Sequence, residues 1–405
     1  MEFGILFTSH PHKDREPYPH QAVHARVTDE ILAADRLGFD CAWVAEHHFS
    51  TEYGIMPDVW VYAGYLAALT KRIKLGMAVV TLPLANPVRV VENAGFVDIL
   101  SGGRVALGLG SGYRKYEFDG FGLDFDARRD MQEEAIAVVL HLFRKGRVSH
   151  KGKYFAAMID GEFELLPRSI QRPHPPLFLA GATDRSIGAA GRLGFGLMLS
   201  TLTPFDGLVK QVAHYRANLA EAGKEARTNP GFGQVDVARW VYVAETDAKA
   251  KQDSEEGLLR HLKHFFGGHQ SGYLGQVSQG KDSVASALDY DTLARSTIIH
   301  GSPETVAERV EELQAKTGLA SLMIHYPPWY GTENAKASLE LFAREVMPDF
   351  RAEVAAREAR KQQELAPHIA AALGRKKWMK PLADHEIPVV KASVTRALVN
   401  RGAAS

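Results

Sequence analysis

The sequence predicts an α/β fold, a TIM-type (β/α)8 barrel with insertions and a C-terminal extension, from three observations. Eight short apolar segments alternate with segments of helical periodicity along the first 350 residues. The apolar segments lack a polar–apolar alternation, which is typical of parallel strands that are joined by right-handed crossovers and covered by helices. Polar residues directly follow several strands, at the end where such a barrel builds its active site. An open, doubly wound sheet is the alternative architecture.

The first half of the chain supplies four strands and four helices. The helix over 23–37 repeats apolar residues on one face and stops at Gly38, which suits the left-handed conformation at a helix end. Pro57-Asp58 and Asn86-Pro87 open the next two helices. The expected strands are 2–8, 41–45, 73–80 and 104–110, and the expected helices are 23–37, 57–70, 86–101 and 126–144.

The second half continues the alternation after a small hairpin over 150–166. Ser302 is expected to cap a helix whose first position is Pro303. The expected strands are 177–180, 197–200, 235–244 and 319–325, and the expected helices are 184–193, 205–222, one that begins at 247, 304–316 and 334–346.

Two segments depart from this pattern. Residues 265–295 are rich in Gly, Ser and Gln and separate the last two strands, so we expect a lid-like insertion there. Residues 351–405 are expected to form a helical, basic extension outside the barrel domain of residues 1–350. Its apolar residues, Trp378 and Ile387 among them, favour contact with a neighbouring subunit, because exposing them to water is costly.

Composition limits the partners. The chain has 405 residues and a formal net charge of 0, so bulk charge favours neither nucleic acid nor a membrane surface. No apolar run approaches the roughly 20 residues of a membrane span. The chain enters its first strand from Met1 without a signal peptide. Cys41 is the only cysteine, and we expect it to be a small core residue in a reducing, cytoplasmic compartment.

The strand over 41–45 ends in Glu46-His47-His48. Burying two imidazoles without partners is costly, so their position needs a reason. One interpretation is that one histidine caps the strand and the other faces solvent. The other is that one of them handles protons for a bound cofactor.

His10-Pro11-His12 follows the first strand, and a His-x-His pair there is typical of one class of metal-dependent barrel hydrolases. That hypothesis needs further ligands at later strand ends. The fifth and sixth strands end in Gly181-Ala182-Thr183 and Ser200-Thr201, and the eighth offers only His325. We therefore expect no metal.

Three other strand ends indicate a flat ligand with one phosphate. Val79-Val80-Thr81 closes the third strand with residues that could support a ring or belong to the core. Gly110-Ser111-Gly112-Tyr113 closes the fourth and lacks the full dinucleotide spacing. Gly181-Ala182-Thr183-Asp184-Arg185-Ser186 enters a helix, whose N-terminus suits a phosphate, with a plain N-cap as the alternative. A mononucleotide flavin has this shape.

Several runs resemble the bacterial luciferase-like flavin monooxygenases. The resemblance covers residues 1 to about 350. It lies in 45–49 (Ala-Glu-His-His-Phe), 82–89 (Leu-Pro-Leu-Ala-Asn-Pro-Val-Arg), 98–104 (Asp-Ile-Leu-Ser-Gly-Gly-Arg), 301–304 (Gly-Ser-Pro-Glu) and 345–348 (Glu-Val-Met-Pro).

The resemblance implies a homo-oligomeric barrel that binds reduced FMN supplied by a separate NAD(P)H-flavin reductase. Oxygen would add at flavin C4a, and the peroxide would oxygenate a small, mostly apolar substrate such as a ketone, aldehyde or alkane. His47 matches the family's active-site histidine and would act as acid/base, with Glu46 orienting it. Val79, Val80 and Thr81 match the flavin-ring support, which leaves open a non-proline cis bond there.

This chain departs from the luciferases at the phosphate. Ser111 stands where they have an Arg, and Gly181-Ala182 stands where they have Glu-Ser. The phosphate would then rely on the N–H groups of Ala182 and Thr183, with Arg185, Ser186 or Arg114 as candidates.

Two alternative functions stay open. One is a deazaflavin-dependent hydride-transfer oxidoreductase of the same superfamily, and the other is a non-catalytic flavin-binding protein. Apolar and aromatic residues expected near the substrate are Phe7, Phe49, Tyr113, Trp240, Tyr326 and Trp329.

Overall fold

The computed structural model describes residues 1–13, 16–50, 53–267, 289–326 and 328–351, together with Gln363, Ala366 and Pro367. The chain divides into two compact units, Met1–Gln362 and Gln363–Ser405. All elements named below lie in the first unit. Most of the predicted C-terminal extension and residues 268–288 of the predicted lid lie outside the described residues.

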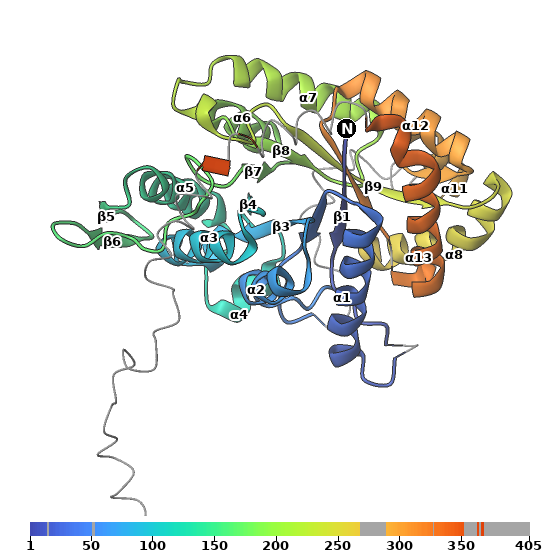
Figure 1. The fold of residues 1–405 in the computed structure, drawn as a ribbon, viewed down its shortest axis with the longest axis horizontal. Coiled ribbons are helices and arrows are strands. Elements are labelled where there is room, and N and C mark those ends of the chain that lie inside the picture. Colours follow the sequence, from blue (N-terminus) through green and yellow to red (C-terminus); the bar gives the residue numbers. More distant parts are fainter. Residues whose placement is uncertain are drawn as a thin grey trace, which may run out of the picture. The chain divides into compact units, whose positions relative to one another are not determined.

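Eight parallel strands form a closed barrel, as predicted (Figure 1). The strands are β1 (Glu2–Phe7), β2 (Cys41–Val44), β3 (Lys74–Thr81), β4 (Val105–Gly110), β7 (Leu177–Ala180), β8 (Gly196–Leu199), β9 (Val235–Val243) and β11 (Ser321–His325). Around the barrel the order is β1-β2-β3-β4-β7-β8-β9-β11, and β11 pairs again with β1.

Helices surround the barrel (Figure 1). They are α1 (Pro19–Leu37), α2 (Val59–Leu69), α3 (Pro87–Ser101), α4 (Lys115–Phe121), α5 (Arg128–Lys145), α6 (Asp184–Leu193), α7 (Phe205–Ala220), α8 (Asp247–Gly267), α11 (Tyr290–Ser296), α12 (Pro303–Thr317) and α13 (Thr332–Leu341). A two-stranded hairpin of β5 (Val148–Lys151) and β6 (Ala156–Ile159) projects beside α5.

Some predicted boundaries were wrong. α1 begins at Pro19, four residues before the predicted start, because Pro occupies its first turn. The short helices α4 and α11 and the short strand β10 (Ile299–Gly301) were not predicted. α11 occupies the end of the segment predicted as a lid. The predicted cap of α12 is confirmed, since the Ser302 hydroxyl accepts from the Thr305 N–H.

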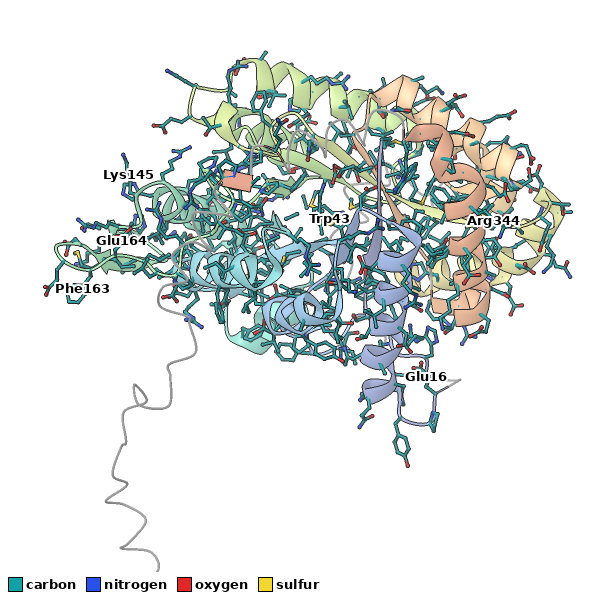
Figure 2. The ribbon with its side chains drawn as sticks, in the orientation of Figure 1. Glu16, Trp43, Lys145, Phe163, Glu164 and Arg344 are labelled. Atoms are coloured by element: carbon teal, nitrogen blue, oxygen red, sulfur yellow. The ribbon has the colours of Figure 1, made fainter. Side chains whose placement is uncertain are left out.

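Trp43 fills the barrel interior (Figure 2). Its indole lies edge-on to Phe178, with ring centroids 5.4 Å apart. Glycines on the two flanking strands make room for it: a Cβ at Gly4 would lie 2.8 Å from the indole, and one at Gly76 would lie 2.2 Å from it. Cys41 is buried in the same cluster, which confirms the prediction that it is a core residue.

The run 98–104 belongs to the scaffold. The Asp98 carboxylate is fully buried and accepts hydrogen bonds from Ser169, Ile170 and Gln171. The Arg104 guanidinium donates to the carbonyls of Ala67, Thr70 and Ile73, at and after the C-terminal end of α2. These contacts tie α2 and α3 and the segment that precedes β7 to the barrel.

Candidate active site

A cavity of about 820 Å³ occupies the mouth of the barrel, at the C-terminal ends of the strands. This is the end where barrel enzymes place their active sites. Most of the predicted site residues line it: Glu46, His47, Val79, Thr81, Ser111, Gly112, Tyr113, Gly181, Ala182, Thr183, Arg185 and Ser186. The residues predicted after β2, at the ends of β3 and β4, and after β7 therefore line the same cavity.

His47 is buried and bonded to an acid that the sequence did not indicate. Its Nδ1 lies 3.0 Å from Oε1 of Glu117 on α4, and the same oxygen accepts from the His48 N–H at 3.0 Å. Glu117 is 2% exposed. A neutral His47 that donates from Nδ1 keeps the lone pair of its Nε2 for the cavity side, as an acid/base group requires.

Glu46 does not orient His47, which corrects the prediction. One of its carboxylate oxygens lies 3.0 Å from Nε2 of His48, and the other accepts from the Thr81 N–H at 3.1 Å. Glu46 therefore fixes His48 and the end of β3. Sequence patterns miss Glu117 because α4 is too short to show helical periodicity. The sequence signal for this helix is Gly122, which ends it in the left-handed conformation.

Two tyrosines surround the His47 ring. The Tyr53 ring lies 4.7 Å from it between centroids, and the Tyr113 hydroxyl lies 3.5 Å from Nε2 of His47. Burial raises the pKa of Tyr113 well above its usual range, so its hydroxyl stays protonated. Arg114 stacks against both tyrosine rings and does not line the cavity. It is therefore no candidate for the phosphate.

The end of β3 departs from regular strand geometry. The peptide bond between Ala78 and Val79 is cis, at the position the resemblance left open, and the pairing with β4 shifts between Met77 and Val80. Across this register shift, Ala78 and Val79 both pack in the barrel interior, whereas Val80 packs in the outer core. Val80, which the sequence placed among the site residues, therefore does not line the cavity.

The α6 N-terminus forms the other side of the cavity. Thr183 accepts from the Ser186 N–H, and the Ser186 hydroxyl accepts in return from the Thr183 N–H at 3.1 Å. This capping box is the N-cap alternative that the sequence left open. The N–H groups at the first two helical positions, Asp184 and Arg185, are not used by the cap.

Positive charge gathers around this end. The Arg185 guanidinium reaches Glu133 at 2.7 Å and Asp130 at 3.2 Å, so acids on α5 hold it at the rim. The arginines that line the cavity are Arg128, Arg129, Arg144, Arg185 and Arg192. Helix N-terminus and guanidinium groups together suit an anion.

The opposite end of the cavity carries imidazoles and an indole. Thr8, Trp240, His261 and His325 line it, and His10 lies behind Thr8. Of the aromatic residues expected near the substrate, Tyr113 and Trp240 line the cavity. Phe7 packs in the outer core, Phe49 is 60% exposed beside Phe121, and neither Tyr326 nor Trp329 lines the cavity.

The predicted His-x-His motif does not build a metal centre in the described part of the chain. Among those residues, no group of three or more His, Cys, Asp or Glu side chains is arranged to hold a metal ion. Nor does any described helix combine the length and apolar character of a membrane span.

Residues 1–321 match the model of the luciferase-like monooxygenase family. Limonene 1,2-monooxygenase of Rhodococcus erythropolis is 30% identical over 337 residues, 80% of each chain. The oxygenase component of flavin-dependent trigonelline monooxygenase of Acinetobacter baylyi is 24% identical, over 82% of this chain and 92% of that one.

Solved structures share the fold. The oxygenating constituent of 3,6-diketocamphane monooxygenase from Pseudomonas putida, in complex with FMN, has a TM-score of 0.71 and 24% identity, over 86% of this chain and 98% of that one. The coenzyme F420-dependent tetrahydromethanopterin reductase of Methanopyrus kandleri has a TM-score of 0.62 and 22% identity, over 86% and 99%. With the family model matching most of its length, the chain belongs to the luciferase-like monooxygenase family.

Proposed function

We propose that this protein is a two-component monooxygenase that uses reduced FMN and O2 to oxygenate a small, mostly apolar organic molecule such as a ketone, aldehyde or alkane. One observation carries the proposal: the α6 N-terminus, the inward-facing Val79 and the His47–Glu117 pair all belong to one cavity. A mononucleotide flavin needs an anion site, a flat wall and a proton-handling group, and these three elements would supply them.

The phosphate end fits a singly phosphorylated cofactor. The N–H groups of Asp184 and Arg185 would meet the phosphate at the positive end of the α6 dipole. Nearby guanidinium groups, Arg129 and Arg192 among them, would add charge. The hydroxyls of Thr183 and Ser186 already serve the capping box, so their part is to hold the helix end in place.

The wall from β3 and β4 fits a flat ring. Val79 packs against Gly110 of β4, where a Cβ would lie 2.4 Å from the valine side chain and would compete with it for this space. Reduced flavin, when bound, supplies the electrons that activate oxygen. His47 would hold or release a proton at Nε2, and Glu117 would fix its ring and stabilise the imidazolium form.

A reductase is the expected partner. The trigonelline relative is named as an oxygenase component, and no nicotinamide-binding fingerprint occurs in this sequence. A separate NAD(P)H-flavin reductase would therefore deliver reduced FMN.

We also infer a homo-oligomer. α2 and α3 pack side by side and expose apolar residues in two stripes: Val61, Tyr65 and Leu69 on α2, and Phe96, Ile99 and Leu100 on α3. Clustered residues of this kind usually mark a protein interface, and a second copy of the chain would cover them.

Deazaflavin-dependent hydride transfer is the second candidate function, because an F420-dependent reductase shares the fold. The test compares the two cofactors on one preparation. We expect reduced FMN, supplied by a reductase and NADH, to give an oxygen-dependent product with one of a panel of ketones, aldehydes and alkanes. Tight binding of the deazaflavin, together with no oxygenated product from reduced FMN, would overturn the proposal.

A further inference from the structure

We propose that the end of the cavity formed by β1, β9 and β11 binds the oxygen-bearing group of a neutral organic ligand, a carbonyl or a hydroxyl, through Thr8, Trp240 and His325. That this ligand is the substrate rests on the proposed function. The binding site itself rests only on side chains of this chain.

This end lies across the barrel from the phosphate end. Counted along the closed sheet, β1 is the fourth strand from β7 in either direction, and α6 follows β7. A cofactor phosphate at α6 and a ligand at β1 would therefore occupy opposite sides of one mouth, with His47 after β2 on the wall between them.

Adjacent strands bring the polar groups together. His325 and Trp240 are register partners on β11 and β9, and β11 also pairs with β1, which Thr8 follows. The Thr8 hydroxyl lies 2.7 Å from Nδ1 of His10 and 3.4 Å from Nε2 of His325. The His261 ring, from α8, lies 6.0 Å from that of His325 between centroids.

The opposite nitrogen of His325 and the indole N–H of Trp240 have no hydrogen-bond partner among the described residues. The two side chains are nearly inaccessible to water, with His325 5% and Trp240 2% exposed. Burying a polar group without a partner opposes folding. Both residues line the cavity, so a small side-chain rotation that brings either nitrogen to a ligand oxygen would remove this cost.

The Thr8 hydroxyl decides what His325 can offer. If Thr8 donates to His10, it accepts from Nε2–H of His325, whose Nδ1 is then an acceptor that suits a hydroxyl. If Thr8 accepts from His10, it donates to Nε2 of His325, whose Nδ1–H is then a donor that suits a carbonyl. The pair can serve both oxygen functions by exchanging tautomers.

The site favours a neutral ligand. All cavity-lining residues from β1, β9 and β11, and the residue after β1, are uncharged: Leu6, Thr8, Ala238, Trp240, Met323 and His325. Burial lowers the pKa of His325 to about 4, and burial together with the neighbouring imidazoles lowers the pKa of His10 well below its usual value. Among the described residues at this end of the cavity, a carboxylate would therefore meet no cation and an ammonium group would meet no acid.

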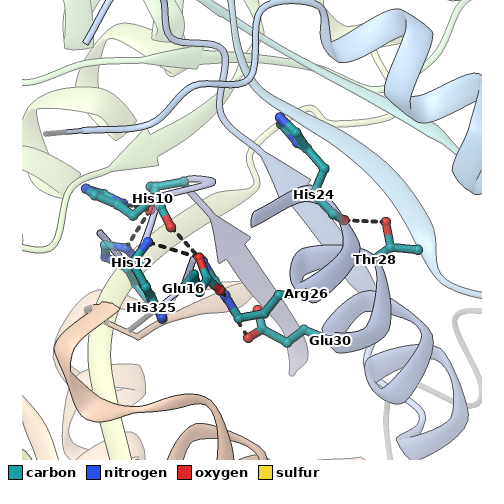
Figure 3. A network of polar contacts seen from close by, with 9 residues as sticks. His10, His12, Glu16, His24, Arg26, Thr28, Glu30 and His325 are labelled. Carbon is teal, nitrogen blue, oxygen red and sulfur yellow. Dashed lines mark hydrogen bonds and ion pairs between the residues drawn. The ribbon is translucent and has the colours of Figure 1, made fainter. Parts of the chain in front are cut away.

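A polar network braces the site from behind (Figure 3). Arg26 on α1 donates to the His10 carbonyl at 2.6 Å and pairs with Glu16 at 2.9 Å. Glu16 in turn accepts from the His12 N–H at 3.1 Å. The segment that follows β1 is thus held from both sides, which keeps His10 in position against Thr8.

Binding of small probes to the full-length, flavin-free protein tests the proposal by calorimetry. The probes are cyclohexanone, cyclohexanol, methylcyclohexane and cyclohexanecarboxylate, which share a ring and differ in the attached group. We expect the ketone and the alcohol to bind at least about tenfold more tightly than the hydrocarbon and the carboxylate, the effect of about one good hydrogen bond. Nitrogen NMR of labelled histidine should show opposite tautomers of His325 with ketone and alcohol.

Variants test whether Thr8 and His325, and not residues outside the cavity, are responsible for ketone binding. Thr8→Val and His325→Phe should reduce the affinity for the ketone to that for the hydrocarbon. Thr8→Ser, which keeps the hydroxyl, should retain the affinity for the ketone. His24→Phe, on α1 outside the cavity, should leave it unchanged. Equal affinity for ketone and hydrocarbon, tightest binding of the carboxylate, or no binding of any probe would overturn the proposal. Because no flavin is present, these results are independent of whether the protein uses reduced FMN.

Discussion

Replacing Asp98 by Asn should destabilise the barrel without changing the site. The substitution keeps the shape of the side chain and turns one carboxylate oxygen into an N–H donor. Oδ2 accepts from the Ser169 hydroxyl and from the N–H groups of Ile170 at 3.0 Å and Gln171 at 3.1 Å. Oδ1 accepts from the Gln171 side-chain amide at 2.7 Å and from the Val105 N–H at 3.4 Å.

In either orientation the amide that Asp98→Asn introduces would point its hydrogens at a buried donor. The less costly orientation loses the bond from the Gln171 amide and the long bond from the Val105 N–H, and it removes the charge from the three bonds to Oδ2. A buried donor left without an acceptor costs about 1–3 kcal/mol, and a charged hydrogen bond exceeds a neutral one by about 1 kcal/mol. With one donor left unpaired and three bonds weakened, we expect a loss of about 5 kcal/mol. With about 2.1 cal/mol/K of unfolding entropy per residue, the unit Met1–Gln362 would lose about 7 °C in Tm.

Differential scanning calorimetry of Asp98→Asn and Asp119→Asn measures this effect. Asp119 lies on the surface of α4, paired with Lys115 and 56% exposed, and its loss should cost less than about 0.5 kcal/mol. FMN affinity should be equal in both variants and in the parent protein. A Tm for Asp98→Asn equal to that of the control, or a selective loss of FMN binding, would refute a scaffold role for residues 98–104.

Three further predictions concern the His47–Glu117 pair, the buried Glu30 and the exposed apolar residues of α2 and α3. Glu117→Gln should lower turnover with reduced FMN about 5- to 10-fold, because a neutral hydrogen bond to His47, weaker by about 1 kcal/mol, replaces the charged one. Glu46→Gln should lower turnover less, and FMN titration should show the same affinity in both variants as in the parent. An equal loss of turnover in the two variants would contradict the His47–Glu117 pairing. Burial raises the pKa of Glu30 from 4.5 to about 7, so its ionised form opposes folding, and stability should fall as pH rises through this range. Glu30→Gln should therefore be more stable than the parent by about 3 kcal/mol at pH 8 and equal to it near pH 4, as urea unfolding would show; a gain that is the same at both pH values refutes this. Tyr65→Lys combined with Phe96→Lys should give monomers in sedimentation experiments, and an unchanged oligomer would exclude the α2–α3 face as the interface.

Sequence patterns predicted the barrel well because its signals are local. Apolar strands, Gly38 after α1 and Ser302 before α12 act through their own neighbours. The turn into α6 was located for the same reason, since Thr183 and Ser186 form a capping box within four residues.

The parts of the site that were missed depend on contacts between distant segments. Glu117 pairs with His47 across seventy positions of sequence, and its helix is too short to show periodicity. Val79 faces the barrel interior and Val80 faces the outer core, the reverse of what a regular strand would give, because the end of β3 breaks the two-residue alternation. Arg114 is adjacent to the residues of the cavity in sequence, yet it stacks behind them on Tyr53 and Tyr113. A pattern within one segment of the sequence cannot predict contacts of this kind.

A crystal structure of the protein soaked with FMN would test the central claim most directly. We expect the phosphate on the N–H groups at the start of α6, and the ring against Val79 with His47 beside it. A mouth that stays empty at saturating FMN, or a ring bound away from His47, would contradict the claim that this barrel is built around a mononucleotide flavin.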